Sequence, residues 1–359
     1  MRALSLLQPL SRSSSTRGLG LAAAAVATSL VLAGCGSADG TDSESGEAAG
    51  DGPQVVTAFY PLEFVAERVA GDRATIETLT DPGTDPHDLE LTVRQTAAIS
   101  DADLVFYLEG LQPAIDQAVE QSAPDTSFDA PVERLSFEND DEHADEDDHG
   151  PEDEHADEDD HGDDDHADED HADENEHADE EDEHGHGSED PHVWLDPLNM
   201  AAIADDMATR LAEVDPDGAE EYEANAADLV TELEELDAAY TEGLATCERD
   251  EVVVSHDAFG YLSKYGLHFE AISGLSPDAE PSPARLAELA DHIDDSGITT
   301  VFTETLASPR LSETLADELN LETAVLDPVE GLTDETADED YLSLMEANLA
   351  ALQQANGCA

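Results

Sequence analysis

Basic residues are scarce in this sequence. Its 359 residues include 12 Lys plus Arg against 91 Asp plus Glu, and Lys264 is the single lysine. The formal net charge of −79 repels DNA, RNA and anionic lipid headgroups, so no nucleic acid is expected as a partner. Two interpretations of the acidity remain. It attracts cations, or it only keeps the protein soluble, for instance in a salty habitat.

Apolar runs long enough to cross a bilayer are also missing. The apolar stretch 19–32, preceded by three arginines, has about 14 residues, fewer than the roughly 20 that a transmembrane helix needs. Residues 1–34 are therefore predicted to be a signal peptide, and a short membrane helix is the alternative. The stretch ends in Leu-Ala-Gly-Cys, which resembles the lipobox of bacterial lipoproteins, so Cys35 is predicted to be lipidated. Residues 35–52 are expected to be a flexible tether.

Cysteine is rare, with three residues in the whole chain. If Cys35 carries lipid, Cys247 and Cys358 remain as a pair in an oxidising compartment. A disulfide between them is expected. The alternative is two separate buried thiols, because sequence alone cannot place two cysteines within bonding distance.

Short runs rich in β-branched residues alternate with helical patterns along the chain. Such alternation is typical of parallel sheets that are covered by helices. The expected strands are residues 54–59, 75–79, 104–108, 251–255, 268–272, 298–302 and 322–326. They fall into two groups, which predicts an N-terminal α/β lobe at 53–214 and a C-terminal α/β lobe at 247–359.

Two helices are expected between the two groups of strands. The first begins at Asp196-Pro197, an N-cap followed by proline, and is predicted to pack on the first lobe. The second, within 215–246, keeps an apolar spacing of three and four residues and would reach about 44 Å at 1.5 Å per residue. A coiled coil is the alternative interpretation, but one helix flanked by two lobes fits a rigid linking helix better.

The segment 138–190 is of low complexity, with 31 acidic residues, nine histidines and no Lys or Arg. It has too few apolar side chains to form a core and is expected to be disordered. Imidazoles spaced among carboxylates can form a low-affinity pool of ligands for divalent ions, so metal capture is predicted. The auxiliary ligands would be His143, His149, His155, His161, His166, His171, His177, His184 and His186.

Three of the five remaining histidines stand beside predicted strands or helix starts: His87, His192 and His256. Asp327 closes the last predicted strand. In open α/β sheets, ligands bind beyond the carboxyl ends of the strands, so these four side chains are expected to converge in a cleft between the lobes. Three imidazole nitrogens and one carboxylate oxygen form a tetrahedral set suited to Zn²⁺.

Six segments resemble the zinc and manganese ABC-transporter substrate-binding proteins. They are residues 85–91, 190–197, 255–261, 274–282, 301–304 and 325–328. The resemblance covers residues 53–137 and 190–357, and it implies two α/β lobes joined by one long rigid helix. It also implies His87, His192, His256 and Asp327 as metal ligands, with Glu304 or water as substitutes for Asp327, because Pro86 departs from the Glu that precedes the first ligand in some zinc members.

The resemblance further implies the function. We expect a monomeric, lipid-anchored protein on the extracellular face of the cell membrane, which captures Zn²⁺ and delivers it to an ABC-transporter permease. Histidine at position 256, where manganese members usually carry a carboxylate, favours Zn²⁺ over Mn²⁺. The alternatives are a manganese-binding homologue, an extracellular metal buffer or adhesin, and a zinc hydrolase. An enzyme is not expected, because a carboxylate that closes the metal shell leaves no position for an activated water.

Overall fold

The computed structural model describes residues 52–135, 189–277 and 279–359. The predicted signal peptide, Cys35, most of the tether and the nine histidines of the acidic tract lie outside these residues. None of the helices in the described ranges has the length and hydropathy needed to cross a lipid bilayer.

Two four-stranded sheets form the framework, and every strand pair in them is parallel. The first sheet has the order β2-β1-β3-β4, with β1 Gln54–Thr57, β2 Thr75–Thr78, β3 Leu104–Tyr107 and β4 Ser127–Asp129. The second repeats this order as β6-β5-β7-β8, with β5 Glu251–Val254, β6 His268–Ala271, β7 Thr300–Thr303 and β8 Glu322–Val325. The prediction of two parallel α/β lobes is confirmed. The sequence analysis missed β4, which has only three residues and no apolar run.

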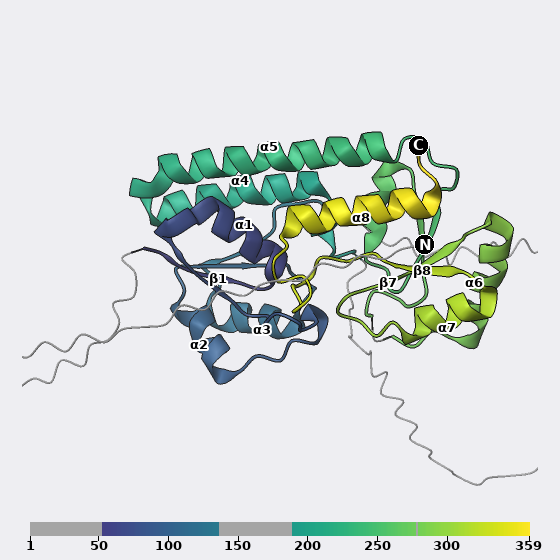
Figure 1. Cartoon of the computed structure of the whole chain (residues 1–359). Helices are drawn as coiled ribbons and strands as arrows, with labels where there is room; N and C mark the ends of the chain where they lie inside the picture. The colour runs from purple at the N-terminus through teal and green to yellow at the C-terminus, as the bar shows by residue number, and fades with distance from the viewer. Residues whose placement is uncertain (1–51, 136–188, 278) are drawn as a thin grey trace, which may run out of the picture. The chain divides into compact units, whose positions relative to one another are not determined.

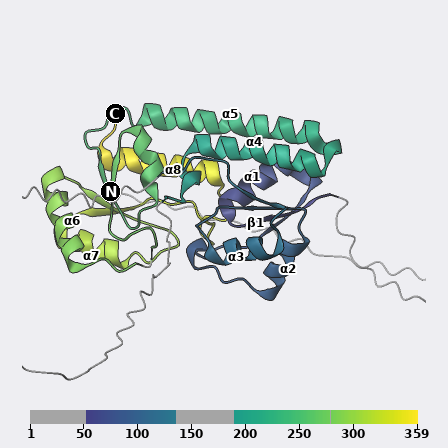
Figure 2. The same cartoon turned by 180° about the vertical axis from the view of Figure 1, so that it is seen from behind.

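Helices cover both faces of each sheet (Figures 1 and 2). In the first lobe, α1 Tyr60–Ala70 lies on one face, and α2 Val93–Asp101 and α3 Pro113–Ser122 lie on the other. In the second lobe, α8 Tyr341–Asn356 lies on one face, and α6 Pro283–Ser296 and α7 Arg310–Leu319 lie on the other. The inner strands β1, β3, β5 and β7 are largely buried, so the middle of each sheet is the centre of a packed core.

The helix α4 Pro197–Val214 begins as predicted, because the Asp196 carboxylate accepts a hydrogen bond from the Leu198 N–H and Pro197 needs no donor. Its apolar face is buried and packs against α1 and α5. The long amphipathic pattern forms α5 Ala219–Gly243, which contacts α1 in the first lobe and α8 in the second. The Tyr240 hydroxyl fixes this second contact by donating to the Met345 carbonyl at 2.7 Å.

The disulfide between Cys247 and Cys358 is confirmed, with the sulfur atoms 2.01 Å apart. It joins the segment that follows α5 to the segment that follows α8. Backbone bonds from Glu248 and Arg249 to the Asn356 carbonyl reinforce the same junction. In the chain-entropy model a crosslink over a loop of about 100 residues stabilises by about 4.7 kcal/mol, so this bridge is a major contribution to the stability of the second lobe.

Candidate metal site between the lobes

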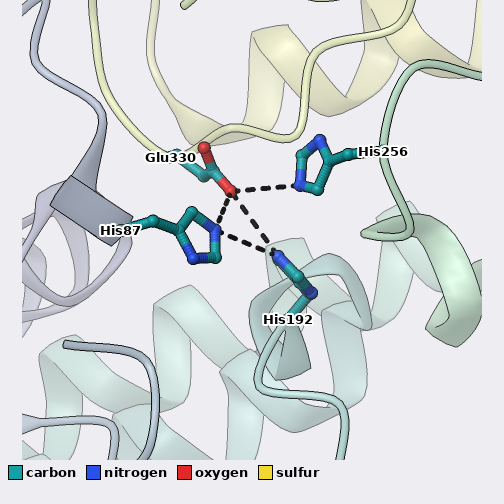
Figure 3. Close-up of side chains that lie close together, drawn as sticks. All are labelled: His87, His192, His256 and Glu330. Atoms are coloured by element: carbon teal, nitrogen blue, oxygen red, sulfur yellow. Dashed lines mark hydrogen bonds and ion pairs between the residues drawn. The ribbon is translucent and has the colours of Figure 1, made fainter. Parts of the chain in front are cut away.

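Four side chains from four separate segments converge at one point: His87, His192, His256 and Glu330 (Figure 3). His87 lies in a short 3₁₀ turn, Pro86–Asp88, and His192 immediately precedes the turn Val193–Leu195. His256 follows β5, and Glu330 lies in the loop after β8. One atom of each side chain lies within 4.8 Å of the corresponding atoms of the other three.

The spacing of these atoms suits a tetrahedral ion. The Glu330 Oε1 atom lies 3.2 Å from His87 Nε2, 3.6 Å from His192 Nε2 and 3.7 Å from His256 Nε2. The Nε2 atoms of His87 and His192 are 3.4 Å apart. With metal–ligand bonds of about 2.0–2.1 Å, the ligand atoms of a tetrahedral Zn²⁺ site lie roughly 3.3 Å from one another. The arrangement therefore needs only small adjustments to hold the ion.

The site is almost closed to solvent. The side chains of His192 and His256 are 0% exposed and that of Glu330 is 2%, whereas the His87 side chain is 12% exposed. The buried His256 Nε2 atom makes no hydrogen bond. A buried polar atom without a partner is costly unless a ligand satisfies it, so this nitrogen itself indicates a place for a metal ion.

Two buried carboxylates orient two of the imidazoles. Asp190 Oδ1 lies 2.7 Å from His192 Nδ1 and also accepts a bond from the His192 backbone N–H. Both oxygens of Glu304 lie 2.8 Å from His256 Nδ1, and Ser255 donates to the same carboxylate. A carboxylate on one ring nitrogen leaves the other nitrogen free to face the ion and makes it a better ligand. Glu304 was considered above as a substitute metal ligand. In the structure it contacts the His256 imidazole instead.

The charges at the site compensate one another in the absence of metal. Burial lowers the pKa of His256, but Glu304 and Glu330 outweigh this effect and raise that pKa to about 10. Burial likewise raises the pKa of Glu330, but the adjacent imidazoles of His256 and His87 outweigh it and hold that pKa below its usual range. The metal-free site thus contains an ionised Glu330 and a protonated His256, and a divalent ion must displace that proton.

The structure differs from the sequence analysis in the fourth residue of the group. Asp327 is buried, but its Oδ2 accepts a hydrogen bond from the Thr305 hydroxyl at 2.9 Å and its Oδ1 accepts one from the Val329 N–H at 2.7 Å. Glu330, three residues further along the same loop, occupies the place that the sequence analysis gave to Asp327. Glu330 lies two residues beyond the segment 325–328, and no sequence pattern distinguished it from Asp327, the carboxylate nearer to the strand.

The three predicted histidines do come together, and the other two lie elsewhere in the second lobe. His268 is exposed on β6 and His292 lies 3.4 Å from Glu251. No other group of three or more His, Cys, Asp or Glu side chains with this spacing exists among the described residues. The nine histidines of the acidic tract cannot be placed relative to the site, because they lie outside the described ranges.

Comparison with known proteins identifies the family of this chain. The family model described as zinc-uptake complex component A periplasmic matches residues 55–355. The zinc-binding lipoprotein AdcA of Streptococcus pneumoniae is 37% identical over 313 residues, which cover 84% of this chain and 55% of that protein. The chain thus spans about half the length of these streptococcal relatives.

One further relative and one solved domain of AdcA match over nearly their whole length. The high-affinity zinc uptake system protein ZnuA of Bacillus subtilis is 33% identical over 331 residues, which cover 90% of this chain and 93% of that protein. The crystal structure of the Zn(II)-bound ZnuA-like domain of S. pneumoniae AdcA superimposes with a TM-score of 0.64 at 33% identity, over 85% of this chain and 99% of that one. The chain belongs to the family of zinc-uptake complex component A proteins.

Proposed function

We propose that this protein is the zinc-binding component of an ABC importer and that His87, His192, His256 and Glu330 hold one Zn²⁺ ion for transfer to the permease. The observation that carries the proposal is the convergence of three imidazole nitrogens and one carboxylate oxygen at tetrahedral spacing. Nitrogen ligands favour Zn²⁺ over Mn²⁺, which prefers oxygen. The zinc-binding names of the relatives support the same choice.

The geometry favours transport over catalysis. A catalytic zinc site keeps one position open for water, whereas Glu330 provides a fourth protein ligand here. The buried carboxylates of Asp190 and Glu304 contact the Nδ1 atoms of His192 and His256, so each orients an imidazole and is proposed not to act as a general base. The ion is therefore cargo, and the chain is proposed to have no enzymatic activity.

The proposal predicts one tight Zn²⁺ ion in each chain. In a titration of the metal-free protein against a chromophoric chelator, one ion should bind tightly and Mn²⁺ should compete weakly. The acidic tract should add weaker ions, because its nine histidines and 31 acidic residues offer many scattered ligands.

In cells that depend on this chain for zinc, chelator-limited growth should require His87, His192 and His256. Equal affinities for Zn²⁺ and Mn²⁺, or normal growth without these histidines, would reject the proposal.

We further propose that the protein is attached to the extracellular face of the membrane through a lipid on Cys35 and works there as a monomer. The support is the Leu-Ala-Gly-Cys sequence at 32–35 and the lipoprotein name of the AdcA relative. Cys35→Ser should move the protein from the membrane fraction to the soluble fraction in a cell fractionation experiment. Ser43→Ala is a matched control, because it is an equally small change in the predicted tether, and membrane attachment should persist. Retention of the Cys35→Ser protein in the membrane would contradict the proposal.

A further inference from the structure

The loop that carries Glu330 contains a strained residue. Val329, which immediately precedes Glu330, has a φ angle of 56° and is fully buried. A β-branched side chain rarely adopts this left-handed conformation, which is strained and requires support from the surroundings. The other described non-glycine residue with positive φ is Asn320, which ends α7 in a common helix-capping conformation. Val329 lies in a loop, and no helix cap accounts for its left-handed conformation.

Asp327 supplies the support from within the loop. Its Oδ1 accepts a hydrogen bond from the Val329 N–H at 2.7 Å, and its Oδ2 accepts one from the Thr305 hydroxyl at 2.9 Å. Its backbone N–H donates to Asn348 Oδ1, and its carbonyl accepts from Asn348 Nδ2. The residue is 4% exposed. One of these four hydrogen bonds closes the turn at Val329, and the other three connect Asp327 to α8 and to the segment after β7.

The first lobe holds the remainder of the loop. The Trp194 indole donates to the Pro328 carbonyl at 2.7 Å, and the Gly83 N–H donates to the Leu332 carbonyl at 2.7 Å. Glu330 lies between these two contacts. The backbone is thus held on both sides of Glu330, and Asp327 holds the turn that precedes it.

We infer that Asp327 is a positioning residue: by holding Val329 in the left-handed turn, it keeps the Glu330 carboxylate within reach of the three imidazoles. This inference rests on the proposed zinc site. Such preorganisation raises affinity because the protein does not have to reorder a ligand when the ion arrives. It also gives Asp327 a role that differs from direct coordination.

Two substitutions separate positioning from coordination. Asp327→Asn keeps an oxygen that accepts from the Val329 N–H and an amide that donates to Thr305, but it removes the negative charge with which a carboxylate coordinates zinc. Asp327→Ala removes both hydrogen bonds. In the full chain, with weak ions removed by a strong competing chelator, Asp327→Ala should lower the Zn²⁺ affinity by about 10- to 100-fold, the range for loss of a residue that supports a ligand. Asp327→Asn should remain within about threefold of the wild type.

The visible absorption of bound Co²⁺ provides a second measurement, which a purely structural role of Asp327 would leave unchanged. Four-coordinate Co²⁺ absorbs visible light strongly, and replacement of the Glu330 oxygen by water should weaken and shift this absorption in Asp327→Ala but not in Asp327→Asn. Asp340→Ala is the matched control. It removes the N-cap of α8, since Asp340 accepts from the Ser343 N–H at 2.9 Å. It should lower the melting temperature without changing affinity or spectrum.

The outcomes distinguish this inference from the proposed function. Failure of the wild-type chain to bind one tight Zn²⁺ ion would reject the proposed function. If the wild type binds, unchanged affinity and Co²⁺ spectrum in Asp327→Ala would overturn the positioning role. An equally large loss in Asp327→Asn would overturn it too, in favour of coordination by the charge. Should Asp327→Ala not fold, Thr305→Val removes one of the two side-chain bonds, and wild-type affinity in that variant would overturn the inference.

Discussion

Replacing His87 by alanine is expected to lower the Zn²⁺ affinity by roughly 10²- to 10³-fold. Zinc binding at four-ligand protein sites is worth about 10–16 kcal/mol, so one ligand represents about 3–4 kcal/mol, and each 1.4 kcal/mol is a factor of ten. The His87 ring lies against Glu330 and against the rings of His192 and His256. The substitution therefore removes a ligand from the edge of the site and leaves both carboxylate-bound imidazoles in place.

Competition with a chelator of known affinity measures this change. His268→Ala is the control, because it removes an exposed imidazole on β6 outside the site and should leave the affinity unchanged. Circular dichroism of both variants checks that the fold persists. Wild-type affinity in the His87→Ala protein, with one tight ion still bound, would show that the four-residue group is not the zinc site.

Zinc affinity is also expected to rise by about 100-fold between pH 7 and pH 9. In the metal-free protein the pKa of His256 is raised to about 10, so this imidazole is protonated throughout that interval. Zinc must displace the proton, and each unit of pH then changes the apparent affinity about tenfold. The affinity rises with pH because fewer protons compete with zinc for His256 at higher pH. The increase should level off above about pH 10, where His256 loses its proton. Glu330 does not contribute in this interval, because its pKa is lowered.

Calorimetric titration of zinc in two buffers with different ionisation enthalpies counts the released protons. About one proton should be released for each tight ion at pH 8, once the weak ions of the acidic tract are accounted for. Asp340→Ala, which lies outside the site, should release the same number. An affinity that is constant from pH 7 to pH 9 and a titration without proton release would contradict the protonated state of His256.

The sequence predicted the framework well because periodicity and caps are local. Strands β1, β2 and β3 and the start of α4 at Asp196-Pro197 follow from β-branched runs and one capping signal. The prediction of the linking helix was correct apart from its first turn, which is the 3₁₀ segment Pro216–Gly218. The strand β4 was missed because three residues at a sheet edge leave no pattern to detect.

The site was less accessible to prediction. Strand-end location and family resemblance identified the three histidines, because each has a distinctive side chain inside a recognisable segment. Asp327 and Glu330 are both acids in one loop, and the choice between them depends on a single φ angle at Val329 and on contacts with Thr305 and Asn348. Those contacts join segments distant in the sequence, so no local pattern reveals them.

The four ligand segments are widely separated along the chain, and this has a consequence for assembly. His87 and His192 are 105 residues apart, and His87 and Glu330 are 243 residues apart. Closing loops of this length is entropically costly and happens only when both lobes have folded. An unfolded chain thus has no tight site, and only scattered histidines and carboxylates can bind an ion weakly. Folding must therefore precede the tight binding of an ion.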